Sequence, residues 1–291
     1  MPLCVHKHVF FLISAIWSFG GCARGSQPLP ATLPHSKALE VLLNDVDHYK
    51  TTNPVHAGHL LAHLMWTEQW ISIWAEQQSG PCRGLVEREK TVLAFAGLIH
   101  DVGKAGSVHN LKYYRIPDHE RIGFEFVMHG IRIDCAYTNE YRTTDGKLFC
   151  FEDVFQELGF SFDEQKRIAL LIAMHSAFIG LLMKGIESDL HIEQFLKMLF
   201  DVATEIDCEL TESLIHMVMV INLADVHAVY RPVAQGVSRV FGTFRQYQTS
   251  EAWGHCDWKL KDAVFAYLDA EKFDALKKRI CVLAHSTSYI K

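Results

Sequence analysis

The segment Leu98-Ile-His-Asp-Val-Gly-Lys104 contains the most informative residues of the chain. Val92, Phe95 and Ile99 precede or overlap it at helical spacing, and Gly103 predicts the end of that helix. His100 and Asp101 therefore stand at the end of an apolar helix, where their different side-chain lengths allow both to reach one cation. Because a charged Asp beside an apolar face is costly unless it is paired or binds a metal, the segment predicts a metal site.

The remaining patterns from residue 35 onward are mostly helical and predict an all-α fold. Asn53-Pro54 predicts the start of a helix that runs to about Gln78. Ser161 and Glu164 form a capping box at the start of another helix, and Thr211 begins a long apolar helix. The exception is the segment 131–151, whose alternating residues around a Thr-Asp-Gly-Lys turn predict a β-hairpin inserted in the helical domain.

Further histidines and one aspartate occur at helical positions elsewhere in the chain. His119 is followed four residues later by Gly123, and His175 continues an apolar helical stripe. Asp225 ends another apolar stripe, where a lone buried carboxylate would be strongly disfavoured unless it were a ligand. Upstream, His56, His59 and His63 share one helix face.

This order of residues, spread from 56 to 225, resembles the HD superfamily of metal-dependent phosphohydrolases. The resemblance implies an HD-type helical bundle, a first metal on one group of side chains and a second metal on another, with Asp101 shared between them. The implied ligands of the first metal are His56, His100, Asp101 and Asp225, and those added by the second are His119 and His175. The first ligand of the family usually opens its helix with apolar residues four and five positions later. His56 matches that pattern better than His59, and His63 is expected to be a partly buried surface residue.

Cationic residues beside these ligands are candidates for binding a phosphate group. Lys104 follows the helix-ending Gly103 and can project over the metal site, which the resemblance associates with phosphate-containing substrates. We assign Asp101 and Lys104 to catalysis, and Lys104, Arg121 and Arg231 to substrate binding. His109 and His227 are weaker candidates for the rim of the pocket.

The function implied by the resemblance is that of a phosphohydrolase or phosphodiesterase that cleaves a phosphate ester with a metal-activated hydroxide. Mixed imidazole and carboxylate ligands favour Mn, Fe, Co, Ni or Zn over Mg, as one or two divalent ions. Two alternatives stay open: a di-iron oxygenase of the same superfamily, which uses the same ligand set, and a non-catalytic metal-binding sensor domain.

Composition and the N-terminus restrict the partners and the location. The chain has 291 residues and a net charge of −6, which gives no general field for nucleic acid. The resemblance implies a small phosphorylated or nucleotide-like substrate. Residues 1–22 resemble a signal or lipoprotein segment in which Cys22 would tether the protein to a membrane. Residues 23–34 are expected to be a linker and 35–291 the HD-type hydrolase domain. This predicts an exported or membrane-anchored protein, or a cytoplasmic one if the segment is not a signal.

Overall fold

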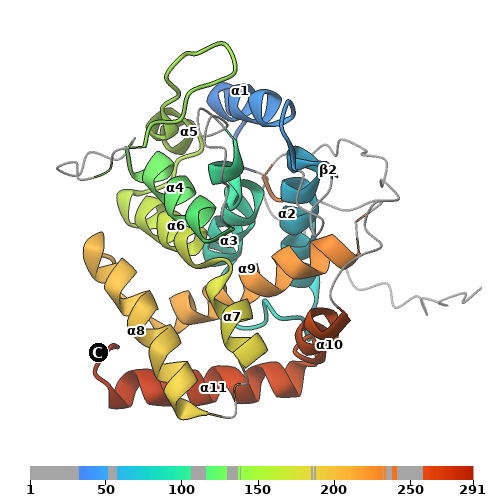
Figure 1. Ribbon diagram of the computed structural model, residues 1–291, viewed down its shortest axis with the longest axis vertical. Coiled ribbons are helices and arrows are strands. Elements are labelled where there is room, and N and C mark those ends of the chain that lie inside the picture. The colour runs from blue at the N-terminus through green and yellow to red at the C-terminus, as the bar shows by residue number, and fades with distance from the viewer. Residues whose placement is uncertain are drawn as a thin grey trace, which may run out of the picture. The chain divides into compact units, whose positions relative to one another are not determined.

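The computed structural model describes residues 33–51, 58–105, 116–129, 137, 139–184, 186, 188–231, 233, 238–240 and 258–290. This part of the chain is mostly helical, which confirms the all-α prediction (Figure 1). The expected signal segment, linker residues 23–32, Asn53-Pro54, His56 and His109 lie outside the described residues. The elements, in chain order, are α1 (Lys37–Val46), β1 (Lys50–Thr51), β2 (Gly58–His59), α2 (Leu60–Glu76), α3 (Glu87–Ile99), the short 3-10 helix η1 (Val102–Lys104), α4 (Ile116–His129), α5 (Phe151–Glu157), α6 (Phe162–Met174), α7 (Ala177–Lys184), α8 (Asp189–Glu205), α9 (Glu212–Tyr230), α10 (Trp258–Ala266) and α11 (Ala270–Ser286).

Helices α2 and α9 form the centre of the core. Helix α2 packs against α3 and α9, and α4 packs against α6 and η1 (Figure 1). Nearly every residue of α2 and α9 is buried, so these helices have apolar side chains on all sides instead of one apolar stripe. Two helical stretches, Phe162–Met183 and Glu212–Tyr230, are long and apolar enough to cross a membrane, but 61% and 89% of their most apolar windows are buried inside the described protein. Such burial is typical of core helices.

Helix starts follow the predicted capping residues where these residues are described. The Ser161 hydroxyl accepts a hydrogen bond from the Glu164 amide at 3.3 Å, and the Ser161 amide donates to the Glu164 carboxylate at 2.8 Å. The Thr211 hydroxyl likewise accepts from the Leu214 amide and begins α9. Helix α2 differs from the prediction, because it begins at Leu60, after the short antiparallel pair of β1 and β2.

The segment expected to form a hairpin is described only from Asn139 onward, apart from Tyr137. Its described part contains a single antiparallel bridge between Arg142 and Leu148, around a turn in which Gly146 has φ +82°. Asp45 of α1 holds this turn, because its carboxylate accepts hydrogen bonds from the Thr144 amide and from the Tyr141 hydroxyl, both at 2.7 Å. The turn is therefore fixed to α1, and a complete hairpin over 131–151 stays a prediction.

Candidate metal centre

Six buried histidine and aspartate side chains from separate elements converge in the core. His63 lies in the first turns of α2, His100 and Asp101 follow α3, and His119 lies in α4. His175 follows α6, and Asp225 lies in the second half of α9. The relative exposures of these residues are 2% for His63, 0% for His100, 1% for Asp101, 2% for His119, 1% for His175 and 8% for Asp225. Residues distant in sequence are thus brought together where water is excluded.

One half of the cluster joins α2, α3 and α9. The Nε2 atom of His63 lies 2.9 Å from Asp225 Oδ1 and 3.2 Å from His100 Nε2. His100 Nε2 lies 3.4 Å from the same Asp225 oxygen. One ligand atom from each of these residues lies within 4.8 Å of the others, a spacing that a single metal ion could span.

The other half joins Asp101 to α4 and to the end of α6. Asp101 Oδ1 lies 2.9 Å from His119 Nε2 and 3.2 Å from His175 Nε2. The two imidazole Nε2 atoms lie 3.2 Å apart. The second oxygen of Asp101 lies 3.5 Å from His63 Nε2 and 3.6 Å from His100 Nε2, so this carboxylate contacts both halves of the cluster.

The tautomers of two imidazoles are fixed by backbone carbonyls. His100 Nδ1 lies 2.8 Å from the Gly97 carbonyl, and His175 Nδ1 lies 2.7 Å from the Ile172 carbonyl. Because a carbonyl only accepts, each Nδ1 must carry a proton, so Nε2 is the nitrogen of each ring that faces the cluster and its lone pair is free for a metal when the ring is neutral. This is the state in which histidine binds a metal through Nε2.

The donor set could hold a positive charge at its centre. Imidazole Nε2 atoms lie 3.2 Å from one another in both halves. Among the described residues, the buried Oδ1 atoms of Asp101 and Asp225 accept no well-aligned hydrogen bond, although imidazole nitrogens surround them. Buried acceptors of this kind are costly unless protons or a metal ion compensate them. The residues therefore fit a divalent cation in each half.

The electrostatics of the cluster favour ionised carboxylates and neutral rings on two of the histidines. Burial alone would raise the pKa of Asp101, but the Lys104 ammonium and then His100 and His119 outweigh it and hold that pKa well below its usual range. Burial is likewise outweighed at Asp225 by His100 and His63, and the pKa of Asp225 is also well below its usual range. Burial lowers the pKa of His63 and of His119, whereas at His175 burial is outweighed by Asp101, Glu120 and Asp225, which raise its pKa. Deprotonated carboxylates and neutral imidazoles are the forms that bind metal.

Lys104 lies at the edge of this cluster, in η1. Two glycines, Gly103 and Gly123, set the distance between η1 and α4. The Lys104 ammonium donates to Asp101 Oδ2, and 11% of its side chain is exposed. A Cβ atom added to Gly103 would lie 2.0 Å from the His119 carbonyl oxygen and 2.6 Å from the Gly123 amide nitrogen. Only two facing glycines allow η1 to approach α4 this closely, which places Asp101 beside His119.

The first ligand predicted from the sequence differs from the residue found in the cluster. His56 lies outside the described residues, and His59 precedes α2 with 48% of its side chain exposed, 4.0 Å from Asp47. His63, expected to be a partly buried surface residue, is instead buried beside His100 and Asp225. The expectation for His63 was wrong because α2 begins at Leu60 and is buried on nearly every side, so its fourth residue faces the core.

The predicted cationic residues other than Lys104 are engaged elsewhere. Arg121 donates to both carboxylate oxygens of Glu205 at 2.7 and 2.8 Å and to Glu125 at 2.8 Å. The Arg231 guanidinium lies over the Phe265 ring, 4.7 Å from its centroid. Binding of a substrate by either arginine therefore stays a prediction. His227 packs its ring against Trp70 at 4.1 Å, and burial lowers its pKa to about 4, as expected for a core residue.

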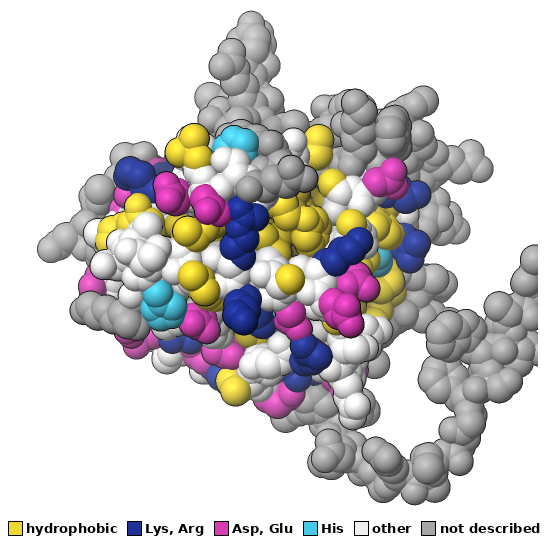
Figure 2. All heavy atoms as spheres, turned by 90° about the horizontal axis from the view of Figure 1, so that it is seen from below, with side chains coloured by type: hydrophobic (Ala, Val, Ile, Leu, Met, Phe, Trp, Pro, Cys, Tyr) yellow, Lys and Arg dark blue, Asp and Glu magenta, His cyan; other side chains and the backbone are white. Residues whose placement is uncertain are grey.

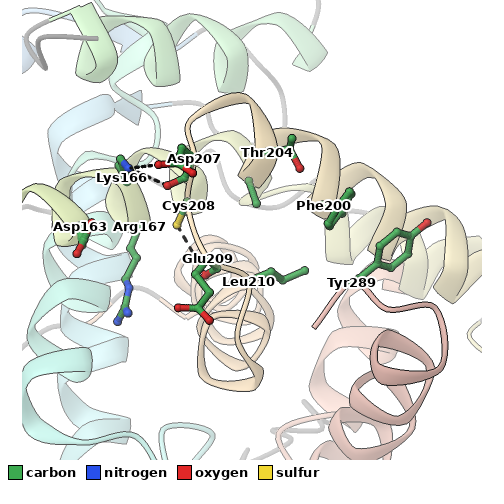
Figure 3. A pocket seen from close by; sticks show the side chains of 11 residues that line it. Asp163, Lys166, Arg167, Phe200, Thr204, Asp207, Cys208, Glu209, Leu210 and Tyr289 are labelled. Carbon is green, nitrogen blue, oxygen red and sulfur yellow. Dashed lines mark hydrogen bonds and ion pairs between the residues drawn. The ribbon is translucent and has the colours of Figure 1, made fainter. Parts of the chain in front are cut away.

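A separate cavity of about 670 Å³ lies where α6 and α8 meet the segment before α9 and Tyr289 (Figure 3). Its lining includes no residue of the cluster. Lys166 closes one side by donating to the Asp207 carbonyl at 2.7 Å, and Arg167 also faces the cavity. These two cations are opposed by the carboxylates of Asp163, Asp207 and Glu209, so the cavity does not select one sign of charge.

One face of the described protein carries a mixture of charged and hydrophobic side chains. On the face that includes α11, Lys and Arg side chains alternate with Asp, Glu and hydrophobic side chains (Figure 2). Such a mixture provides no extended basic stripe on this face for a nucleic acid.

Sequence reasoning missed Glu120, which contacts the cluster from outside, and Ser176, which holds Glu120. Glu120 follows His119 directly, is 5% exposed and places Oε2 3.2 Å from His119 Nδ1. Ser176 follows His175 directly and donates its hydroxyl hydrogen to Glu120 Oε1 at 2.5 Å. The signal available in the sequence was a polar side chain immediately after each histidine.

Comparison with known proteins adds no relative. The chain matches no protein-family model, no curated protein and no solved structure. Function must therefore be argued from the geometry of the site.

Proposed function

We propose that this chain is a metal-dependent phosphoric ester hydrolase with an HD-type arrangement of its metal ligands. One observation carries the proposal: four imidazoles and two carboxylates from elements distant in sequence converge in a buried cluster, in the order of residues that resembles the HD superfamily. We assign His63, His100, Asp101 and Asp225 to one metal ion, and His119 and His175, with Asp101 shared, to a second. His63 replaces His56 in this assignment.

The residues around the ions would have different roles in the reaction. When bound, a divalent ion of this kind acts as a Lewis acid and lowers the pKa of a water molecule in its coordination shell. Asp101 links the two halves of the cluster, and its contact with the Lys104 ammonium keeps it ionised. Lys104 brings a cation next to the ligands, where it would offset the negative charge of a phosphate group in the ground and transition states.

The approach of substrate is restricted by burial. Asp225 and Lys104 have the most exposed side chains of the set, at 12% and 11%, whereas those of His100 and Asp101 are 0% and 1% exposed. We assign the substrate to the neighbourhood of these two side chains. A small phosphate ester suits so buried a site better than a duplex nucleic acid, which agrees with the net charge of −6.

The test combines metal analysis of the purified full chain with turnover of chromogenic phosphate mono- and diesters. We expect one to two equivalents of a transition metal, and hydrolysis that is lost in Asp101→Asn and His63→Ala and kept in His59→Ala. His59 is the matched control because it lies four residues before His63 and 48% of its side chain is exposed. Hydrolysis at the wild-type rate by Asp101→Asn would refute the proposal. Iron binding with an oxygen-dependent absorbance change and no hydrolysis would replace it with the oxygenase alternative.

A further inference from the structure

The imidazole of His119 lacks the backbone support that fixes two of its neighbours. His100 and His175 each direct Nδ1 at a carbonyl three residues earlier, at 2.8 and 2.7 Å. His119 lies instead in the first turns of α4. No well-aligned hydrogen bond to its Nδ1 is found among the described residues, and that atom is buried. A ligand histidine needs such a partner to hold its tautomer and ring plane.

Glu120 places a buried carboxylate oxygen next to that nitrogen. Its Oε2 atom is also buried and without another hydrogen-bond partner among the described residues, and it lies 3.2 Å from His119 Nδ1. The other oxygen is anchored, because Ser176 donates to Oε1 at 2.5 Å. Two buried atoms that each need a partner therefore face one another, and a residue adjacent to His175 holds the carboxylate in place.

We propose that Glu120 is the positioning residue of His119, held by Ser176, and that it tunes the affinity of the second metal position. The inference rests on the proposed function, since it needs a metal on His119 and His175. The Nδ1–H of His119 would donate to Glu120 Oε2, which fixes Nε2 as the metal-binding nitrogen and makes it a stronger donor. Ser176 follows His175 directly in the chain, so the support of His119 is anchored beside the other ligand.

This role differs from a direct bond between Glu120 and the metal. A ligand atom from Glu120 also lies within 4.8 Å of ligand atoms from His119 and His175, so ligation is the competing assignment. The 3.2 Å approach to the Nδ1 atom, on the opposite side of the ring from Nε2, favours the positioning role. The two roles give different results when the carboxylate is replaced by an amide, which can still accept from Nδ1–H but is a weak metal ligand.

In the experiment, the metal-free full chain is titrated with Co²⁺. Calorimetry and the visible absorption of the bound ion monitor each binding step. Removal of an outer-shell partner typically lowers metal affinity roughly 10- to 100-fold. We expect Glu120→Ala to weaken one of two binding steps by about this factor, Glu120→Gln to weaken it less, and Ser176→Ala to weaken the same step. Glu125→Gln is the control, since Glu125 lies on the same helix and binds Arg121 and Asn139.

A second measurement detects positioning directly. Nitrogen-15 shifts of the His119 ring in the Zn²⁺-loaded protein should report protonated Nδ1 and metal-bound Nε2 in the wild type, and a changed Nδ1 environment in Glu120→Ala. Wild-type affinity of Glu120→Ala for both ions would overturn the inference while the proposed function stands. Loss of a ligand from the Co²⁺ absorption spectrum in Glu120→Gln would overturn it in favour of ligation. A wild-type chain that binds no divalent ion would instead refute the proposed function together with the inference.

Discussion

Replacement of Gly103 by Ala tests how the close contact between η1 and α4 builds the metal centre. The added Cβ would meet the His119 carbonyl oxygen at 2.0 Å, and ordinary contact requires at least 3.4 Å. The atoms on the other side are backbone, so no side chain can turn aside, and η1 must move away from α4. The movement of η1 that this contact requires is several times larger than about 0.2 Å, the variation that metal–ligand distances tolerate.

The expected effect has a part in stability and a part in metal binding. Extra methyl groups in a packed core cost about 1–3 kcal/mol, and we place Gly103→Ala at the upper end because backbone atoms clash. That loss corresponds to a fall in Tm of several degrees for a protein of this size. Asp101 and His119 would separate, so binding of one metal ion should weaken beyond what the loss of stability explains.

Two other glycines provide a graded series for the assay. A Cβ on Gly123 would lie 3.0 Å from the Ile172 side chain, so Gly123→Ala should have an intermediate effect, and Gly180 in α7 has no atom within 4 Å of its added Cβ. Thermal unfolding with and without Mn²⁺ should rank the variants as Gly103→Ala, Gly123→Ala and then Gly180→Ala, from the largest loss to none. Equal Tm and equal metal affinity for Gly103→Ala and the wild type would refute the packing argument.

Further predictions concern the ligands, the metal and a buried acid. His63→Ala should remove one binding step from a calorimetric titration with Mn²⁺, whereas His59→Ala should not. If His59→Ala removed the step and His63→Ala did not, His59 would be the ligand in place of His63. Chelation should lower Tm, because an ion at 100 times its Kd stabilises the folded state by about 2.7 kcal/mol; an unchanged Tm would contradict a resident ion. Lys104→Met should reduce turnover of phosphate esters by tenfold or more and leave metal content unchanged, as measured by steady-state kinetics and metal analysis. Burial raises the pKa of Glu68 to about 7, so its folded form holds a proton that the unfolded form releases above its ordinary pKa of 4.5. The resulting stability is present below pH 4.5 and is lost as the pH rises to about 7, a change of roughly 3 kcal/mol in the free energy of unfolding. Urea unfolding at pH 5 and pH 8 should show this change in the wild type and not in Glu68→Gln. Parallel pH profiles of the two proteins would contradict the prediction.

Five of the six clustered residues were predicted from the sequence, because each stands in a recognisable helical context and their order along the chain resembles that of the HD superfamily. His100 and Asp101 end an apolar helix, His175 and Asp225 extend apolar stripes, and His119 precedes a helical glycine. A polar residue on an otherwise buried face must meet a partner in the core. These positions could therefore be chosen from sequence without knowledge of the tertiary contacts.

The choice among the upstream histidines could not be made in this way. Leu60, Leu61, Leu64 and Met65 surround His63, and all of them are buried, so α2 has no single apolar stripe from which a facing position can be read. The predicted start at Asn53-Pro54 then favoured His56, which would stand near the beginning of a longer helix. The pairing of Glu120 with Ser176 is likewise a tertiary contact, since 56 residues separate the two side chains.

The two halves of the cluster are built on the same local plan. Each pairs a histidine at the C-terminal end of a helix, His100 or His175, with one in the first turns of another helix, His63 or His119. Carbonyls in the last turn of a helix have no partner within the helix, so His100 and His175 can use one of them to orient their rings without help from distant residues. An imidazole in the first turns has no such carbonyl and depends on tertiary partners. Mutations that loosen the centre from outside the ligand set should therefore act mainly through His63 and His119, which is why Glu120 and Gly103 matter more than their exclusion from the ligand set suggests.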